Sequence, residues 1–398
     1  MMLAPSFLFS SPDSMTHGSL PVLPLRQAYA RRNALLFLFF MLGVIYASWA
    51  ARIPAIRDAQ GLDAATLSLV LLCSGIGAVA SFPLAAWLVA HVGARRSAWF
   101  FGLALLLGLP ALAWAPGLSW LMAAGVLYGA ASSCFDVAIN ALGAALEKQE
   151  QRSLMSTLHA WFCVGSFSGA LMGGAIAATG LTPGWHFTLI ALVCVWPLRL
   201  ACQILPQDRP QHDPSRRIFA VPHGHLVALG IIAFCGAVIE GSTADWSGVY
   251  LKDHLQASDG MAPLAFAGFT GMMLVARLLG DRWKERFGAR AVVATGAFVA
   301  AIGILIASAA HSLPLALAGF ALAGAGAATV FPFIYSAAGR HGPSALAGVA
   351  TLGYSGNLLG PPLFGVVAHT WGISMGFVFI AALCVAVTLA ASRARWLE

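Results

Sequence analysis

The sequence predicts an all-α, polytopic membrane protein, with twelve transmembrane helices in two pseudo-symmetric six-helix halves around a central cavity. The first observation is composition: 59% of the 398 residues are apolar and only 9% are charged, whereas soluble domains carry about 25% charged residues. The second is that the chain contains twelve apolar runs. Each has about 17 or more residues, close to the length that spans about 30 Å of hydrocarbon.

The third observation is an internal repeat. Three glycines recur at a constant offset of 191 residues, so that Gly165, Gly169 and Gly174 correspond to Gly356, Gly360 and Gly365. The strings VGARR (92–96) and FGARA (287–291) each follow the second apolar run of their half. Chance matches between glycine-rich helices are the alternative, but the constant offset favours a duplicated unit with parallel halves related by an axis along the membrane normal.

The repeat divides the chain into four parts. We expect a cytoplasmic N-terminal tail at 1–32, an N-terminal six-helix half at 33–205, a cytoplasmic linker at 206–225 and a C-terminal half at 226–398. The linker contains PQDRPQHDPSRR, which is polar and rich in proline. The tail lacks a basic start and a small-residue cleavage site, so it does not fit a signal peptide. Met15 is an alternative start.

The distribution of basic residues predicts the orientation. With the N-terminus inside, eighteen of the 22 Lys and Arg residues lie on the cytoplasmic side, and only Arg57 and Lys252 lie outside. The positive-inside rule then places both termini and the linker in the cytoplasm. The expected location is the inner membrane, as a multi-pass protein and a monomer. The net charge of +7 comes from helix ends and gives no reason to expect nucleic acid.

One apolar run of the first half carries a carboxylate. Gly129, Ser133, Asp136 and Asn140 recur at helical spacing and therefore share one face. Small residues beside an acid suit a face that lines a cavity, and acids inside the membrane are functional by default. The alternative is that Asp136 is held by a neighbouring helix, for example through His159. We predict Asp136 as a proton-coupling residue and Asn140 as a substrate ligand.

Further polar residues lie inside the runs of the second half. Glu240, in VIEGST, is the second candidate for proton coupling. Asp245 lies nearer the outer end. A structural role there, as an extracellular gate or a helix-end hydrogen bond, is as good an interpretation as a functional one. Arg277 and Asp281, spaced i and i+4, predict a local salt bridge or a cytoplasmic gate.

Aromatic and amide side chains complete the predicted binding site. They are Tyr46, Trp49, Tyr335, Tyr354 and Asn357, of which the last two share a face at i and i+3. Rings and amides with few cations suit a neutral polar solute such as a sugar or polyol, although most aromatic residues simply pack. We expect the Pro361-Pro362 pair to interrupt its helix, because proline removes backbone hydrogen bonds.

Several strings resemble the major facilitator superfamily, and within it a fucose-permease-like branch of bacterial inner-membrane permeases. The strings are WAARIP (49–54), FDVAIN (135–140), LHAWFCVGSFSGA (158–170), EGSTADWSGVYL (240–251) and RLLGDRWKERFGAR (277–290). FDVAIN is similar to the fourth-helix segment of sugar–proton symporters, which implies proton and substrate roles for Asp136 and Asn140. The chain departs from the family pattern at Ala90, where the loop motif usually has an acid, and at Ala50, where fucose permease has a carboxylate.

The loop signals that follow the second helix of each half suggest gates. Arg95 lies in the first copy, and the second copy retains an acid, Glu285, with Arg286. We include these residues with Arg277, Asp281 and Asp245 as gating candidates.

The resulting hypothesis is a secondary transporter, coupled to protons, that moves a small polar organic solute by alternating access. A proton-coupled drug or metabolite exporter is the alternative; its helix 5 motif is only partly matched, because Ala170 stands where that motif has proline. A non-transporting sensor is a third class. The sequence has no phosphate-binding loop for ATP and no hydrolase triad or HExxH pattern, so we expect no enzyme, no cofactor and no metal.

Overall fold

The computed structural model describes residues 25–150, 154–206, 223–394 and 397, and all fourteen elements in these residues are α-helices. They are α1 (Leu25–Gln60), α2 (Ala64–Ala80), α3 (Phe82–Val92), α4 (Ala94–Ala113), α5 (Leu118–Glu150), α6 (Met155–Ala178), α7 (Pro183–Ile204), α8 (His225–Leu255), α9 (Leu264–Phe287), α10 (Ala289–Ser308), α11 (Leu313–Ala327), α12 (Val330–Gly339), α13 (Pro343–Trp371) and α14 (Ile373–Arg393).

These helices form twelve membrane-length rods. Ten stretches of the described chain are long and apolar enough to cross a membrane, and two of them, Ala64–Val92 and Leu313–Gly339, each join two consecutive helices. With α9, whose apolar part is Leu264–Gly280, and the 29-residue α13, the total is twelve. The predicted fold class is therefore confirmed.

Prolines explain where two of the rods break. Pro83 lies at the start of α3, directly after the break at Ser81. Pro332, in the first turn of α12, has no N–H to donate to the carbonyl of Ala328, and the chain turns between α11 and α12 at that point. By contrast, α13 runs through Pro361 and Pro362 without interruption, so the predicted break there is wrong. Packing against neighbouring helices can keep a membrane helix continuous where proline frees backbone carbonyls.

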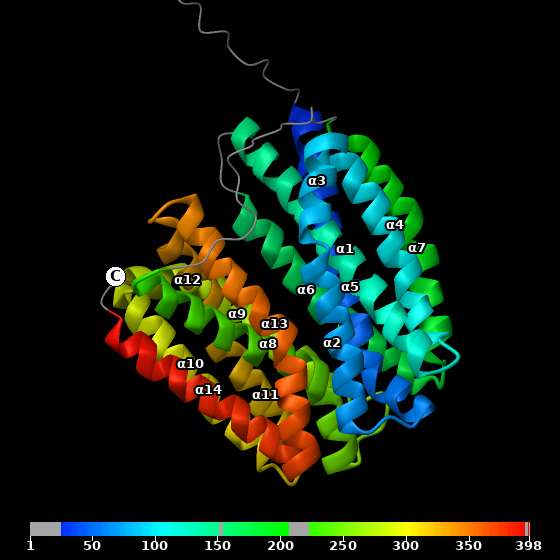
Figure 1. The fold of residues 1–398 in the computed structure, drawn as a ribbon, viewed down its shortest axis with the longest axis vertical. Helices are drawn as coiled ribbons and strands as arrows, with labels where there is room; N and C mark the ends of the chain where they lie inside the picture. The colour runs from blue at the N-terminus through cyan, green and yellow to red at the C-terminus, as the bar shows by residue number, and fades with distance from the viewer. Residues whose placement is uncertain (1–24, 151–153, 207–222, 395–396, 398) are drawn as a thin grey trace, which may run out of the picture.

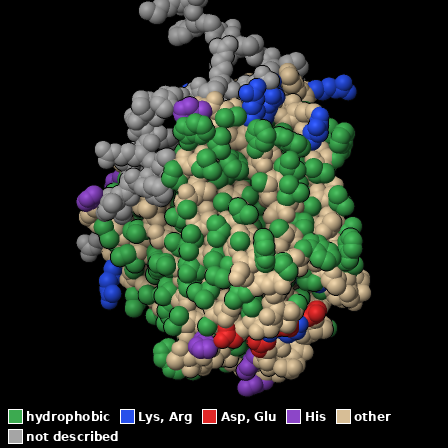
Figure 2. All heavy atoms as spheres, turned by 45° about the vertical axis from the view of Figure 1, so that its right-hand side comes forward, with side chains coloured by type: hydrophobic (Ala, Val, Ile, Leu, Met, Phe, Trp, Pro, Cys, Tyr) green, Lys and Arg blue, Asp and Glu red, His purple; other side chains and the backbone are tan. Residues whose placement is uncertain are grey.

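The helices group into two halves, α1–α7 and α8–α14 (Figure 1). One end of the molecule, which we call the basic end, carries the start of α1 and the corner between α3 and α4. The opposite end, which we call the ion-pair end, carries the end of α1 and the end of α8. The ribbons of the two halves approach each other at the ion-pair end and diverge toward the basic end (Figure 1). Between the two ends the surface is a broad apolar belt. Basic side chains lie above it, and acidic side chains lie below it together with basic ones and histidines (Figure 2).

The internal repeat is visible in the backbone. Gly93 and Gly288 form the corners α3–α4 and α9–α10, with φ/ψ of 94°/150° and 80°/151°, a left-handed region that favours glycine. Their numbers differ by 195. The same offset relates two close helix contacts: a side chain on Gly129 would collide with the backbone of Ser74, and one on Gly324 would collide with Phe269. The halves are thus built alike, down to single contacts.

Glycines also set the packing of α6 on α1. A Cβ atom on Gly169 would lie 2.8 Å from the Val44 carbonyl oxygen, and one on Gly173 would lie 2.7 Å from Ala51. The small residues of α6 therefore face α1 and let the two backbones approach closely, as small-residue ridges do in membrane helices. Ala170, on a neighbouring face, is fully buried too.

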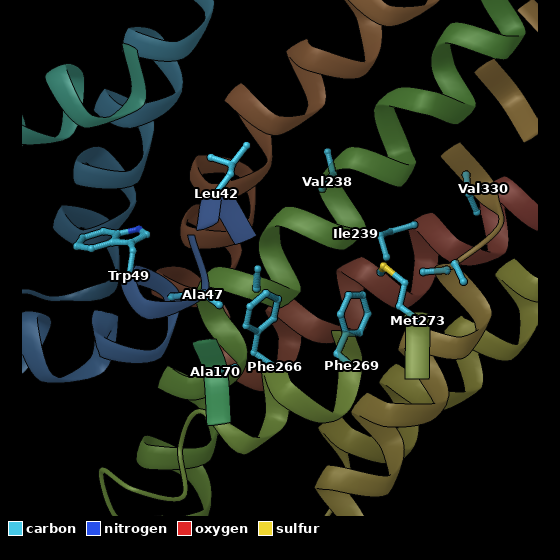
Figure 3. Close-up of a cluster of buried hydrophobic side chains, with 14 of the residues drawn as sticks. Leu42, Ala47, Trp49, Ala170, Val238, Ile239, Phe266, Phe269, Met273 and Val330 are labelled. Carbon is cyan, nitrogen blue, oxygen red and sulfur yellow. The ribbon is translucent and has the colours of Figure 1, made fainter. Parts of the chain in front are cut away.

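The core continues from one half to the other. Buried side chains of α1, α6, α8, α9 and α12 form part of one apolar cluster, which includes Trp49, Ala170, Ile239, Phe266 and Val330 (Figure 3). Two equivalent pairs of rods make the flanks of this interface. On one flank Leu358 of α13 lies 2.9 Å from a Cβ built on Gly75 of α2, and on the other Phe167 of α6 lies 2.9 Å from a Cβ built on Gly271 of α9.

Candidate functional site

The acid of the first half lies on α5 between the halves. Asp136 is partly exposed, and Asn140, one turn later, donates its Nδ2 to Asp136 Oδ1 at 2.9 Å. Asp136 and Asn140 therefore lie on one helix face, as predicted, and are also joined by a hydrogen bond. Gly129, which was predicted on the same cavity-lining face, instead packs directly on the backbone of α2. The alternative anchor, His159, packs edge-on against Phe39 with ring centroids 5.3 Å apart.

The second acid, Glu240, is held by an arginine. Arg277 Nη2 lies 3.3 Å from Glu240 Oε1, and both side chains are about a quarter exposed. Arg277 also donates Nη1 to Cys163 Sγ at 3.0 Å and Nε to the carbonyl of Ala328 at 3.2 Å. The guanidinium therefore joins α8, α6 and the break between α11 and α12. We had expected Arg277 in a cytoplasmic gate with Asp281; the structure places it at the centre instead, and the side chain of Asp281 lies outside the described residues.

The third acid, Asp245, is nearly fully buried, at 9% exposure. It lies within electrostatic range of two tyrosines of the first half, Tyr46 and Tyr128. The ring of Tyr128 packs on Trp49 with centroids 6.1 Å apart, and that of Tyr46 packs on Phe266 at the same separation. Asp245 therefore faces the opposite half from within the core.

The remaining predicted ligands come from the second half. Tyr335 lies within electrostatic range of Glu240, and the side chain of Asn357 lies 3.4 Å from a Cβ built on Gly241. Tyr354 is 40% exposed, lies within electrostatic range of Asp136 and stacks at a tilt on Phe82, with centroids 4.7 Å apart. The predicted polar residues thus gather from both halves around one central region.

The gating candidates at the basic end lie apart from this region. Arg95 donates to the carbonyl of Leu205 at 3.2 Å, a bond within its own half. Arg286 is exposed and lies over the ring of Phe287, and Glu285 is also exposed. Arg95 lies in the first turn of α4, and Glu285 and Arg286 lie in the last turn of α9, so all three are at helix ends of the basic end.

Sequence reasoning missed a cluster of ion pairs that joins the halves at the ion-pair end. Arg57 of α1 binds Asp253 of α8 through two nitrogens, each at 2.6 Å, and Lys252 of α8 lies 2.6 Å from Asp58 of α1. Lys252 also binds Asp259 at 2.5 Å. We call the two reciprocal pairs between the halves the outer clamp. A pocket of about 570 Å³ adjoins it and is lined by residues of both halves.

A second feature that the sequence did not single out is a buried cation in the first half. Arg52 is only 3% exposed and donates to the carbonyl of Leu181, in the turn between α6 and α7. His186 of α7, fully buried, lies within electrostatic range of it. The bond ties the end of α1 to the α6–α7 turn. The position of Arg52 within the string WAARIP did not indicate that it would bind this turn.

Twelve rods in two repeat-related halves, with acids gathered between them, define a secondary transporter of the membrane. The family model described as the Major Facilitator Superfamily matches residues 34–238 and 229–398. The chain belongs to this superfamily and is a multi-pass membrane protein.

Two curated relatives are similar to this chain over most of its length. The chain is 34% identical over 358 residues to an uncharacterised MFS-type transporter of Yersinia pestis, covering 89% of this chain and 93% of that protein. It is 32% identical over 366 residues to membrane protein MosC of Rhizobium meliloti, covering 90% and 88%.

Solved structures share the fold at low identity. The nucleoside transporter NupG has a TM-score of 0.70 at 14% identity, covering 91% of this chain and 98% of that one. A bacterial homologue of the human lysosomal transporter Spinster, in an inward-facing and occupied conformation, has a TM-score of 0.72 at 15% identity, covering 94% and 98%.

Proposed function

We propose that this protein is a proton-coupled transporter that moves a small polar organic solute, sugar-like or a polyol, by alternating access. The observation that supports it best is the placement of Asp136 and Glu240. The two carboxylates come from opposite halves, each is partly exposed, and each has a hydrogen-bonding partner, Asn140 and Arg277 respectively. Acids inside a membrane protein usually mark ion or substrate pathways.

The coupling of proton and solute movement follows from the free-energy cost of burying an ionised carboxylate when the site closes. An ionised carboxylate that is sealed away from water without a partner is strongly unfavourable. The described partner of Asp136 is an amide, which carries no charge to balance an ionised carboxylate when water is excluded, and a bound proton removes that cost. A solute that supplies hydrogen bonds to Asn140 and Asp136 would then move together with the proton.

The side chains around the two acids favour a neutral polar solute. Tyr335, Tyr354 and Asn357 offer hydroxyl and amide groups, which donate and accept hydrogen bonds. The one described arginine in the region, Arg277, is neutralised by Glu240. A resemblance to fucose-permease-like permeases points the same way.

We place the basic end in the cytoplasm and the protein in the inner membrane, as a monomer. The support is the positive-inside bias of the Lys and Arg residues. In this orientation the outer clamp faces the periplasm and the divergent ribbons face the cytoplasm (Figure 1). The conformation is then an outward-closed one.

The experiment compares uphill uptake with exchange in proteoliposomes. Solutes are first chosen by thermal stabilisation, from a panel of monosaccharides, polyols and nucleosides, because a ligand of the folded state raises its stability. Asp136→Asn should still exchange the selected solute but should not accumulate it under a proton gradient. Asp63→Asn, which changes an exposed helix-capping acid in the same way, should accumulate it normally.

Three results would contradict the proposal. Uphill uptake by Asp136→Asn with an unchanged pH dependence would remove Asp136 from coupling and leave Glu240 as the candidate. Accumulation on the opposite side of the membrane would identify an exporter of drugs or metabolites. Binding without any flux would identify a sensor.

A further inference from the structure

We propose that the hydrogen bond from Arg277 to Cys163 is a polar latch between the two halves, closed while Glu240 is ionised and released when Glu240 is protonated. Arg277 belongs to α9 in the second half and Cys163 to α6 in the first, and their atoms lie 3.0 Å apart. Arg277 is thereby a positioning residue. The role of Glu240 as a proton carrier rests on the proposed function; the latch itself rests on geometry.

The internal repeat provides a second, equivalent contact for comparison. The offset of 195 that relates Gly93 to Gly288 takes Phe82 to Arg277, and the offset of 191 that relates Gly165 to Gly356 takes Cys163 to Tyr354. Phe82 and Tyr354 also meet across the halves, with centroids 4.7 Å apart. The two flanks of the interface therefore close at the same level, one through two rings and the other through a guanidinium and a thiol.

The guanidinium of Arg277 is held at this level from three directions. Its Nη2 faces Glu240 at 3.3 Å, and its Nε binds the carbonyl of Ala328 at 3.2 Å. That carbonyl is available because Pro332, four residues later, has no N–H. The remaining nitrogen, Nη1, is directed to Cys163. The side chain is thus anchored in its own half and reaches across with the one nitrogen left.

The charge of Glu240 decides whether this arrangement can be sealed from water. Arg277 stays protonated under all ordinary conditions, and its charge is balanced by an ionised Glu240. Protonating Glu240 removes that balance and leaves a single cation between the halves, which is strongly unfavourable away from water. Separation of the halves toward the basic end, where the ribbons diverge (Figure 1), admits water to the guanidinium. The contact between Phe82 and Tyr354 on the other flank does not depend on the charge of Glu240.

Other titratable groups face the latch and must be separated from Glu240. Tyr46 of α1 and Tyr335 of α12 lie within electrostatic range of Glu240, as Cys163 does. His159 of α6 lies within range of Arg277. His159 is the alternative source of a pH dependence near neutrality.

The test measures the separation of the halves in the absence of any solute. Spin labels are attached through ketone amino acids at Arg96 and Arg282, which are both exposed at the basic end, so that all native cysteines remain. The distance distribution of the full chain in lipid nanodiscs is recorded from about pH 4 to 9, the range in which buried carboxyls titrate. We expect a shift toward long distances as the pH falls.

Single substitutions show which residue causes the pH-dependent shift in distance. Glu240→Gln should give long distances at every pH, and Cys163→Ala should do the same while Cys163→Ser, which keeps an acceptor, should retain the wild-type response. His159→Gln and Phe82→Leu should leave the pH response in place. A pH response that persists in Glu240→Gln, or one that is unaffected by Cys163→Ala, overturns the latch.

The outcome separates the latch from the proposed function. A latch that responds to pH in a protein without proton-driven uptake would refute the transport coupling and leave the latch standing. Proton-driven uptake with a separation independent of pH would refute the latch alone.

Discussion

The outer clamp should hold the ion-pair end closed, and neutralising Asp253 should loosen it. Asp253→Asn removes the charge that Arg57 binds through two nitrogens at 2.6 Å. The amide keeps the size of the side chain, so the change acts through charge. The reciprocal pair of Lys252 with Asp58 remains, at 2.6 Å. We therefore expect a partial opening of this end and an intact fold.

The magnitude follows from geometry and exposure. Two charge-assisted hydrogen bonds in a fork would contribute about 1.5–3 kcal/mol in a buried site. The side chain of Asp253 is 41% exposed and that of Arg57 is 14% exposed, so solvent screening lowers this toward the range of exposed pairs, about 0.2–1 kcal/mol. We expect a loss of about 1–1.5 kcal/mol, which is about a five- to twelvefold shift in the closed-to-open ratio.

A double-mutant cycle with Arg57→Gln provides the assay. The closed-to-open ratio is measured by distance distributions between labels at the ion-pair end, one on each half. The two single variants and the double variant should show a coupling of at least about 0.5 kcal/mol, as contacting charges do. Asp259→Asn is the matched control, because Asp259 binds Lys252 within the second half. A coupling near zero, or an equal effect of Asp259→Asn, would refute the clamp.

Three further outcomes are expected. Gly169→Leu should abolish folded protein, because a Cβ there already lies 2.8 Å from the Val44 carbonyl oxygen, whereas Ala175→Leu at an exposed position of α6 should be tolerated; equal yields of both in membranes would count against the ridge. A reporter fused after Glu398 should give a cytoplasmic signal, and a periplasmic signal would reverse the orientation. Glu240→Gln should cut transport per folded molecule, and a lowered melting temperature with normal transport would make that residue structural.

The fold could be predicted from sequence because it is determined by properties averaged over long stretches of the chain. The share of apolar residues, the length of the runs and the position of basic residues are averages over many residues, and single errors do not alter them. Helix breaks are different, because they depend on the surroundings of one proline. Pro332 coincides with a break between α11 and α12, whereas Pro361 and Pro362 lie within a continuous helix.

The site could be predicted only as far as single residues carry a signal. Asp136 and Asn140 were predicted to share a helix face from their spacing, and the structure joins them by a hydrogen bond. Arg277 was assigned to a local pair for the same reason, yet its ion-pair partner, Glu240, lies 37 positions away on another helix. Spacing along one helix cannot predict pairing between helices, which depends on the rotation of each helix about its axis.

The outer clamp could have been found from the repeat. Arg57-Asp58 and Lys252-Asp253 are basic–acidic dipeptides separated by the same 195 residues that relate Gly93 to Gly288. Two equivalent dipeptides at the ends of the first helices of both halves must lie near the pseudo-twofold axis. Each base can then reach the acid of the other copy, which is the pairing present. From the sequence, Arg57 and Lys252 were used only as the two basic residues on the outer side, and Asp58 and Asp253 were not considered.

The repeat also distinguishes the packing contacts, which occur in both halves, from the acids of the central region, which do not. Contacts that depend on shape occur twice, such as Gly129 on Ser74 within the first half and Gly324 on Phe269 within the second, because both halves are built on the same helix packing. The acids of the central region do not recur: the offset of 195 takes Asp136 to Phe331, an aromatic residue whose ring lies at a tilt to that of Tyr335. A second buried carboxylate at that place would add a desolvation cost at each closure. If the halves move against each other as proposed, charges in one half are enough to control that motion. Phe331→Asp should then destabilise the closed state, measurable as a shift toward long distances between the Arg96 and Arg282 labels. An unchanged distribution would show that the second half has room for a charge at that position, and that the asymmetry has no mechanical cause.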